Sequence, residues 1–273
     1  CGQALATHPL IRKVTLIGSV STGKAILKSA AETLKPSLLE LGGKNALIAF
    51  PDASLKDLVD GIIRGMNYTW AGQSCGSTSR VFLHESIHDE VLQNVSRQLV
   101  ERHVPGLPTN MRTTMGPMIS AVRRDEVLAF IESAKREGAR LVVGGKVPNS
   151  PLLSEGFYVE PTIFADVLPW MQIAQQEIFG PVMSVFRWGS EQELLSAVNG
   201  TEFGLTASIW TRSLKTAHEF AAKVEAGYVW VNQVSRHYLG MPFGGVKNSG
   251  IGREECLEEL LEFTTTKSVN LHF

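Results

Sequence analysis

Apolar residues occur along the chain in two patterns, as short continuous runs and as stretches with helical spacing. Short apolar runs bounded by glycine or proline are typical of buried strands, and helical spacing is typical of amphipathic helices. The first run, Val14–Ile17, predicts a strand, followed by a tight loop over 18–23 and a helix over 24–34 that ends before Pro36. Because strands and helices alternate in this way, the sequence predicts an α/β fold with a substantially parallel sheet.

The same alternation continues to the C-terminus. Apolar residues at helical spacing between 55 and 66 predict an amphipathic helix that delivers the chain to Cys75, just beyond the helix end. The last ten residues, 264–273, are rich in threonine and apolar residues and predict a strand, which needs a partner. Loops are expected over 148–156 and 244–252. The remaining expected elements are strands over 38–41, 46–50, 81–83, 140–143 and 228–231, and helices over 87–99, 122–135 and 214–224.

The composition is that of an ordinary soluble globular protein. The 273 residues are 44% hydrophobic and carry a formal net charge of -1, which gives no electrostatic case for nucleic acid or anionic membrane as a partner. We therefore expect a small-molecule partner. No stretch reaches the roughly 18 uninterrupted apolar residues of a membrane helix, and the expected compartment is cytoplasmic. The three cysteines, Cys1, Cys75 and Cys256, are odd in number and widely spaced, which suits reduced thiols.

The segment Gly18-Ser19-Val20-Ser21-Thr22-Gly23-Lys24 has the glycine and lysine spacing of a P-loop between a strand and a helix. A P-loop NTPase needs Ser or Thr after the lysine to hold magnesium, and Ala25 occupies that position, which disfavours this function. Small residues before a helix still allow backbone N–H groups to approach the phosphate of a nucleotide. The alternative is a tight turn without a ligand.

The segment His84-Glu85-Ser86-Ile87-His88 matches the HExxH pattern of zinc proteases. Zinc ligation requires both histidines on one face of a helix. Here residues 81–83 are strand-like, and Ser86 is a natural N-cap for a helix that begins at Ile87. We therefore expect both histidines to be solvated loop and first-turn residues, with no metal bound.

Three further side chains are candidates for chemistry. Cys75 is flanked by the small residues Ser74 and Gly76, a setting that exposes a thiol, although a lone cysteine is more often an inert core residue. Glu40 ends an apolar strand, where a carboxylate is costly unless it is paired or functional. Glu177 precedes an aromatic residue and a rigid turn, and its carboxylate could accept hydrogen bonds from ribose hydroxyls.

Taken together, five motifs resemble those of the aldehyde dehydrogenase superfamily and occur in that family's order over essentially the whole chain. They are Gly18-Ser19 before a helix, Glu40-Leu41-Gly42-Gly43-Lys44, Gly72-Gln73-Ser74-Cys75, Glu177-Ile178-Phe179-Gly180-Pro181, and Pro242-Phe243-Gly244-Gly245 with Ser249-Gly250-Ile251-Gly252-Arg253-Glu254.

This resemblance implies an NAD(P)-dependent oxidoreductase that converts an aldehyde to a carboxylic acid. It implies that Cys75 is the nucleophile, which forms a thiohemiacetal and then a thioester, and that Glu40 is the base that activates water. Members that transfer the acyl group to CoA typically lack this base, so hydrolysis is favoured. The resemblance places Gly18 and Ser19 at the cofactor pyrophosphate, Leu41 at the nicotinamide region, and Glu177 and Phe179 at the ribose and ring.

The resemblance also implies a division of the chain. Residues 1–41 would be the end of an NAD(P)-binding domain of Rossmann-like type, 42–253 the catalytic domain, and 254–273 a helix and strand that form a homodimer or homotetramer. Because the chain starts at Cys1 and the family's first cofactor-binding strands would lie upstream, we expect a fragment of a longer protein. The choice between NAD and NADP therefore stays open, as does the aldehyde, for which Tyr68, Thr69 and Trp70 suggest a partly aromatic wall. An inactive truncated chain that acts at most as an oligomerisation partner is the alternative.

Overall fold

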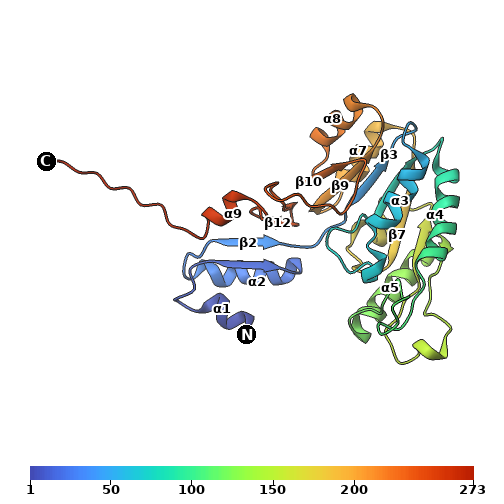
Figure 1. The fold of residues 1–273 in the computed structure, drawn as a ribbon, viewed down its shortest axis with the longest axis horizontal. Coiled ribbons are helices and arrows are strands. Elements are labelled where there is room, and N and C mark those ends of the chain that lie inside the picture. Colours follow the sequence, from blue (N-terminus) through green and yellow to red (C-terminus); the bar gives the residue numbers. More distant parts are fainter.

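A seven-stranded sheet forms the centre of the larger of two lobes in the computed structural model, which describes all of residues 1–273 (Figure 1). The strand order is β10-β9-β3-β4-β7-β6-β5, and every neighbouring pair is parallel except β5 with β6. The predicted α/β fold with a substantially parallel sheet is therefore confirmed. The strands are β3 (Ala46–Ala49), β4 (Arg80–His84), β5 (Arg140–Val143), β6 (Thr162–Ala165), β7 (Val182–Trp188), β9 (Thr206–Trp210) and β10 (Tyr228–Val231).

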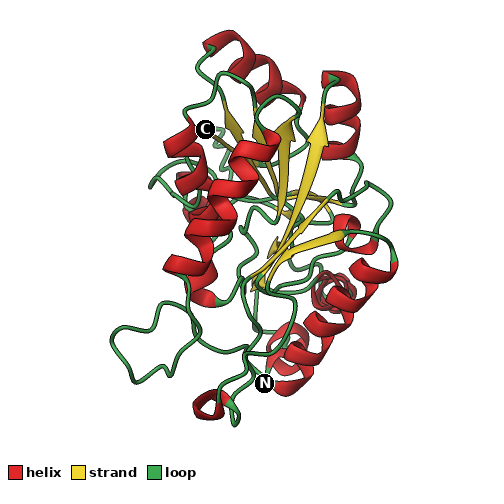
Figure 2. Cartoon of the chain, turned by 90° about the vertical axis from the view of Figure 1, so that its right-hand side faces the viewer, coloured by secondary structure: helices red, strands yellow, loops and turns green.

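Helices cover both faces of this sheet, as Figure 2 shows. Strands β3, β6 and β9 are consequently buried along their whole length. Only β3 reads as a continuous apolar run in the sequence, whereas β6 and β9 include Thr or Ser and were not among the expected strands. The helices of this lobe are α3 (Leu55–Gly65), α4 (His88–Arg102), α5 (Ala121–Arg136), α6 (Gln172–Gln175), α7 (Glu191–Asn199) and α8 (Leu214–Lys223), with short 3₁₀ turns at Tyr68–Trp70 and Pro151–Leu153.

A three-stranded sheet in the order β1-β2-β12 forms the smaller lobe. Strands β1 (Val14–Ile17) and β2 (Ser37–Glu40) are parallel, and β12 (Gly250–Ile251), which lies more than 200 residues later, pairs antiparallel with β2. The lobe also contains α1 (Gly2–Thr7), α2 (Val20–Ala31) and α9 (Leu257–Leu261). A second short antiparallel pair is formed by β8 (Phe203–Gly204) and β11 (Val246–Lys247). It attaches the segment just before β12 to the larger lobe.

Helix α2 begins four residues earlier than the sequence pattern predicts. Ser19 is its N-cap and accepts a hydrogen bond from Thr22 N–H, so Gly23 lies inside the helix instead of in a loop. A Cβ at Gly23 would lie 2.8 Å from the Leu41 side chain, so the glycine allows α2 to pack closely on the residue after β2. This tertiary contact outweighs the low helix propensity of glycine.

The C-terminal residues 264–273 do not pair as a strand within this chain. They are exposed and run away from the smaller lobe as an extended tail (Figure 1). An extended segment becomes a strand only when another strand supplies its hydrogen bonds, and this chain places none beside the tail. The residues just before it are held by Lys13, which pairs with Glu262 and whose Nζ lies 4.5 Å from the centre of the Phe263 ring.

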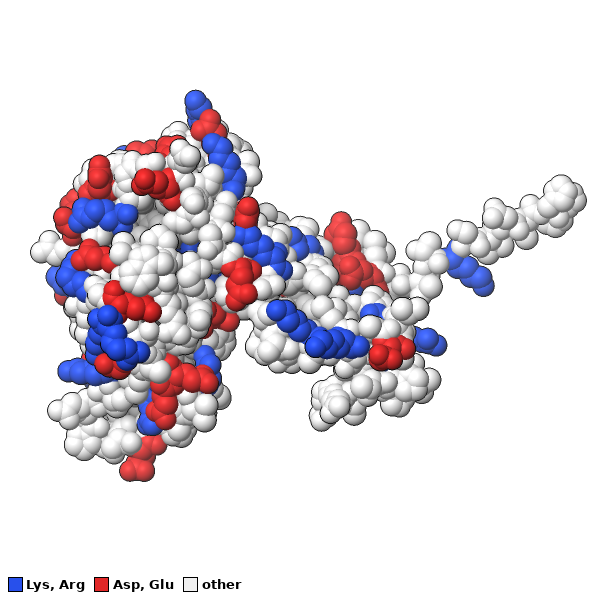
Figure 3. Space-filling model, turned by 180° about the vertical axis from the view of Figure 1, so that it is seen from behind, with Lys and Arg blue, Asp and Glu red and all other residues white.

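Acidic and basic side chains are mixed over the face shown in Figure 3, without a large field of one sign. This distribution agrees with the formal net charge of -1. None of the helices has the length and apolar character needed to cross a bilayer.

The packing of α3 on the sheet gives a test of the fold. A Cβ at Gly61 would lie 2.2 Å from the ring of the buried Trp210. We expect Gly61→Ala to lower the free energy of unfolding by about 1–3 kcal/mol, because overpacking outweighs the better helix propensity of alanine. Urea unfolding measures this change.

The matched control is Gly116→Ala, since a Cβ at Gly116 would meet nothing within 4 Å. An unchanged or increased stability of Gly61→Ala would contradict the packing of α3 against Trp210.

Candidate functional site

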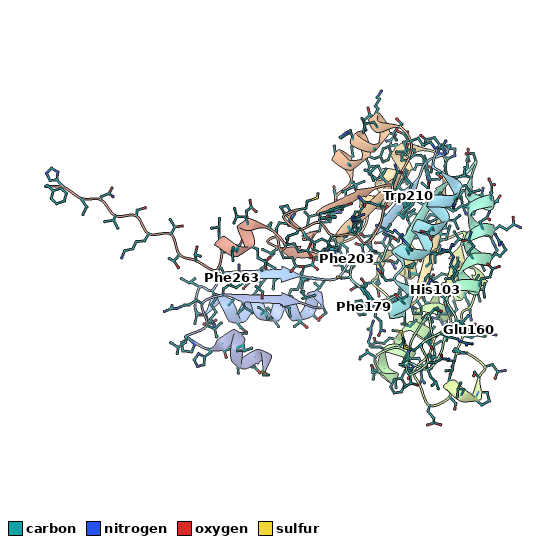
Figure 4. The ribbon with its side chains drawn as sticks, in the orientation of Figure 1. His103, Glu160, Phe179, Phe203, Trp210 and Phe263 are labelled. Carbon is teal, nitrogen blue, oxygen red and sulfur yellow. The ribbon has the colours of Figure 1, made fainter.

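A cavity of about 540 Å³ lies where the two lobes meet. Its lining contains all of the catalytic and cofactor-binding residues that the sequence predicted, from both lobes. In Figure 4 the labelled Phe179 lies on the side of the larger lobe that faces the smaller one. The lining residues are Ile17, Gly18, Ser19, Glu40, Leu41, Gly42, Trp70, Gln73, Ser74, Cys75, Arg123, Glu177 and Phe179.

Cys75 and Glu40 are in direct contact in this cavity. Cys75 Sγ lies 3.7 Å from Glu40 Oε2, within the distance of a hydrogen bond donated by sulfur. Glu40 is only 2% exposed, and its Oε1 has no hydrogen-bond partner. The pair therefore joins a thiol to a buried carboxyl group that has one oxygen left without a partner.

The electrostatics of this pair keep both groups protonated in neutral solution. Burial, with a further contribution from the nearby Glu254 carboxylate, raises the pKa of Glu40 to about 8. Burial, with the negative charges of Glu40 and Glu177, raises the pKa of the Cys75 thiol to about 12. The Gly76 N–H opposes that shift. Glu40 thus becomes a base only as the pH rises through about 8.

The backbone around Cys75 is fixed by close contacts. The sequence predicted that Cys75 follows directly after the helix end. Instead α3 ends at Gly65, and the 3₁₀ turn Tyr68–Trp70 lies between α3 and Cys75. Gly72 then adopts φ 68°, and a Cβ there would lie 2.2 Å from Gly180 O, so only glycine fits. The Cys75 amide N–H donates to no acceptor in the chain and is free to bind an oxyanion.

A buried asparagine holds the other side of this turn. Asn45 Nδ2 donates to Cys75 O at 2.6 Å and to Ser77 O at 2.9 Å, and its Oδ1 accepts from Thr206 N–H. Asn45 therefore fixes the Cys75 segment to the central sheet. The sequence did not mark Asn45 as a site residue, because nothing near it in the sequence indicates a contact with Thr206, 161 residues away.

The position of Glu40 is set by the segment that returns from the C-terminal part of the chain. Gly250 in β12 pairs with Glu40, and Leu41 N–H donates to Ser249 O at 2.9 Å. The Ser249 hydroxyl, fully buried, donates to Gly42 O at 2.7 Å and accepts from Gly204 N–H. These bonds hold the backbone on both sides of Glu40.

Glu177 projects toward the same backbone from the larger lobe. Gly43 N–H donates to Glu177 Oε1 at 3.1 Å, and a Cβ at Gly42 would lie 2.1 Å from Glu177 Oε2. Burial raises the pKa of Glu177, while the Gly43 N–H and the cations Lys44 and Arg123 oppose the shift. Its carboxylate can therefore accept hydrogen bonds at the cavity surface.

The N-terminus of α2 opens at the rim of the cavity beside Glu40. Gly18 N–H donates to Glu40 O at 3.0 Å, and Ser19 caps the helix. The N–H groups of Val20 and Ser21 have no acceptor in the chain and can bind an anion.

Neither the P-loop-like segment 18–24 nor the HExxH segment 84–88 forms the site that its pattern suggests. Lys24 lies inside α2 and is exposed, so no loop of the P-loop kind wraps around a phosphate. His84 ends β4 and His88 begins α4, so the two histidines do not share one helix face. Our expectation that both are solvated is wrong for His88, which is fully buried with its Nδ1 bonded to Asp89.

Several lining residues were not predicted as site residues, among them Ile17, Gln73 and Arg123. Of the three residues expected to form an aromatic wall, Tyr68 is buried away from the cavity, Thr69 does not line it, and only Trp70 does. Trp70 is 62% exposed, and Gln73 fixes its turn by donating to Trp70 O at 3.0 Å.

Comparison with known proteins gives consistent matches along the chain. The family model described as "Aldehyde dehydrogenase family" matches residues 1–269. Aldehyde dehydrogenase tropH from Talaromyces stipitatus is 58% identical over 276 residues, which cover 100% of this chain and 53% of the relative. Betaine aldehyde dehydrogenase from Sinorhizobium fredii is 44% identical over 98% of this chain and 54% of the relative. The chain therefore spans about half the length of these curated relatives.

Solved structures agree with these matches. The NAD+ complex of aldehyde dehydrogenase from Bacillus cereus has a TM-score of 0.93 at 38% identity and covers 98% of this chain and 53% of that chain. A structure described as a putative aldehyde dehydrogenase from Burkholderia cenocepacia has a TM-score of 0.94 at 38% identity, covering 100% of this chain and 57% of that chain.

The buried carboxyl of Glu40 makes stability depend on pH. Its pKa is raised in the folded state, so the folded state keeps a proton that the unfolded chain loses, and stability falls between about pH 4.5 and 8. We expect Glu40→Gln to be more stable than wild type by about 2–4 kcal/mol at pH 9, with a much smaller difference at pH 5. Urea unfolding at the two pH values tests this.

Glu155→Gln, which changes an exposed loop carboxylate, is the control and should have the same small effect at both pH values. A Glu40→Gln effect that is independent of pH would contradict the raised pKa of Glu40.

The negative charge of Glu40 also holds back ionisation of Cys75. Removing it should increase the thiolate fraction, so we expect iodoacetamide to modify Cys75 about three- to tenfold faster in Glu40→Gln than in wild type at pH 9. Peptide mass spectrometry measures the rate, with Cys256 in the same protein as internal control. Slower modification of Cys75 would mean that Glu40 promotes thiolate formation.

Proposed function

This chain belongs to the aldehyde dehydrogenase family, as its motifs predicted, and on that premise we propose that the protein oxidises an aldehyde to its carboxylic acid with NAD+ or NADP+. The observation that supports this reaction best is the contact of Cys75 Sγ with Glu40 Oε2 at 3.7 Å in a cavity shared by both lobes. We propose residues 1–41 as the end of the cofactor-binding unit and 42–253 as the catalytic unit.

The residues around the cavity suit a dinucleotide. The free N–H groups at the start of α2, next to Gly18 and Ser19, suit its pyrophosphate. The Glu177 carboxylate suits ribose hydroxyls, and the Phe179 ring and Leu41 side chain suit the flat nicotinamide. When bound, the nicotinamide supplies the acceptor for hydride.

The chemistry at Cys75 begins with formation of a bond between sulfur and the aldehyde carbon. The thiol proton leaves to Glu40 or water, and the Cys75 N–H stabilises the negative charge that develops on the carbonyl oxygen. Loss of hydride from this thiohemiacetal restores the C=O bond and leaves a thioester on Cys75. The acyl group is thereby held in place for the second step.

Glu40 serves the second step. Its carboxylate removes a proton from water, the resulting hydroxide attacks the thioester carbon, and the sulfur of Cys75 leaves as the C–S bond breaks. The acid product departs, and Cys75 takes a proton back. Because the pKa of Glu40 is about 8, turnover should rise with pH up to about that value.

We further propose that the protein assembles as a homodimer or homotetramer through its C-terminal residues. The supporting observation is apolar surface left uncovered on α9 and the tail. The exposed apolar residues there are Leu257, Leu260, Leu261, Phe263, Val269, Leu271 and Phe273.

Substitution at the two reacting residues tests the proposed reaction in the full-length protein. Cys75→Ala should abolish aldehyde-dependent NAD(P)H formation, because no acyl-enzyme can form. Glu40→Gln should lower kcat by about 100- to 10,000-fold and remove the rise of kcat with pH near 8, while a first burst of NAD(P)H persists. Rapid-mixing absorbance at 340 nm measures both.

Cys256→Ala is the control, since Cys256 lies outside the cavity and should be dispensable. Aldehyde oxidation at the wild-type rate by Cys75→Ala would overturn the proposal.

A further inference from the structure

Arg123 reaches the cavity from the first turn of α5 without belonging to any motif. Its backbone is fixed because the N-cap Ser120 accepts a hydrogen bond from Arg123 N–H at 3.3 Å. Its guanidinium extends away from the helix, where Nη2 donates to Ile178 O at 2.9 Å and Nη1 pairs with Glu126. Arg123 thus links α5 to the segment that carries Glu177 and Phe179.

The segment that Arg123 contacts has an unusual backbone. Phe179 adopts φ 51°, a left-handed conformation that a bulky residue rarely takes, so surrounding contacts must impose it. Arg123 Nη2 is the only donor that the chain offers to Ile178 O, the carbonyl directly before Phe179. The Arg123 hydrogen bond is therefore placed where it can impose the conformation of Phe179.

The same segment is packed against the turn that leads to Cys75. A Cβ at Gly180 would lie 2.5 Å from the Val127 side chain of α5, and a Cβ at Gly72 would lie 2.2 Å from Gly180 O. A shift of the segment would consequently disturb contacts on both sides of the cavity.

Arg123 also affects Glu177 electrostatically. The charged and titratable groups that face Glu177 are Lys44, Arg123 and Cys75, and the Gly43 N–H binds its carboxylate. Burial favours the neutral acid, whereas Lys44 and Arg123 favour the carboxylate. Lys44 is completely buried, and burial with the nearby Arg80 lowers its pKa to about 7, so Arg123 is the cation that keeps its charge throughout the neutral range.

We propose that Arg123 is a positioning residue for the dinucleotide: by holding the Ile178 carbonyl, it keeps Phe179 in its left-handed conformation and the Glu177 carboxylate turned to the cavity. The inference rests on the proposed function, in which Glu177 and Phe179 bind the ribose and nicotinamide. The effect of Arg123 falls on cofactor binding, because its guanidinium contacts neither Cys75 nor Glu40.

The test compares Arg123→Gln, Arg123→Lys and Arg124→Gln with wild type in the full-length protein. Arg124 is the matched control because it is the next residue of the same helix turn and pairs with Asp125 instead of the loop. Calorimetry measures the Kd for NAD+ and for NADP+ between pH 5 and 9, and steady-state kinetics measures KM and kcat.

For Arg123→Gln we expect the Kd and KM of the better-bound dinucleotide to rise about tenfold, as for loss of one charged hydrogen bond, with kcat within about twofold. As the pH is lowered, Arg123→Gln should lose affinity for the dinucleotide at a higher pH than wild type does. Without the Arg123 charge the pKa of Glu177 is higher, so its carboxylate is protonated at a higher pH. Arg123→Lys keeps the charge and should restore the pH dependence while recovering only part of the affinity. Arg124→Gln should match wild type.

Wild-type Kd in Arg123→Gln would overturn the inference, and so would weaker binding with an unchanged pH profile, which is the signature of a general structural defect. Thermal unfolding of each variant identifies that defect directly. Absence of aldehyde-dependent NAD(P)H formation by the wild type would instead overturn the proposed reaction. The Kd values for the dinucleotides would still test the role of Arg123 in that case.

Discussion

The antiparallel pairing of β12 with β2 is the contact on which the geometry of the cavity depends. It brings Gly250 beside Glu40, and the buried Ser249 adds hydrogen bonds to Leu41 and Gly42. Because β1 and β2 are parallel, their carboxyl ends meet at one edge, where Gly18 N–H bonds to Glu40 O. Glu40 and the start of α2 are therefore held at the cavity by a few backbone bonds, one partner of which lies more than 200 residues away.

This arrangement places ionisable groups where they are costly. Glu40 has an unpartnered oxygen in a buried position, and Lys44, four residues after the end of β2, has an unpartnered Nζ. Burial moves the pKa of Glu40 up to about 8 and that of Lys44 down to about 7, so both charges are reduced in neutral solution. A stable core would avoid such groups, but in the proposed reaction Glu40 acts on water as a base and needs an unsatisfied carboxylate, so its destabilising effect follows from that chemistry.

Much of this structure could be predicted from the sequence because the signals are local. Apolar runs predicted β3, β4, β5 and β10 of the large sheet, whereas β6, β7 and β9 were not among the expected strands. The motifs around Glu40, Cys75 and Glu177 marked residues that do line one cavity. Several of the remaining differences share one physical origin, since they depend on a partner distant in the sequence. Gly23 lies in a helix because it packs on Leu41, a contact with a residue outside the helix. The contacts of Asn45, Ser249 and Arg123 escaped prediction for the same reason.

The two lobes contribute different parts of the cavity, and glycines allow the segments around it to approach one another closely. Gly42 approaches the Glu177 carboxylate and Gly72 approaches Gly180 O within distances that no Cβ would permit. Each close approach joins segments that belong to different βα units, so the backbone itself forms the junction. Because the two segments at each close approach are in contact, a shift of one segment also moves the other. A residue such as Arg123, which lies outside the reacting pair, can therefore influence the site by fixing a single carbonyl.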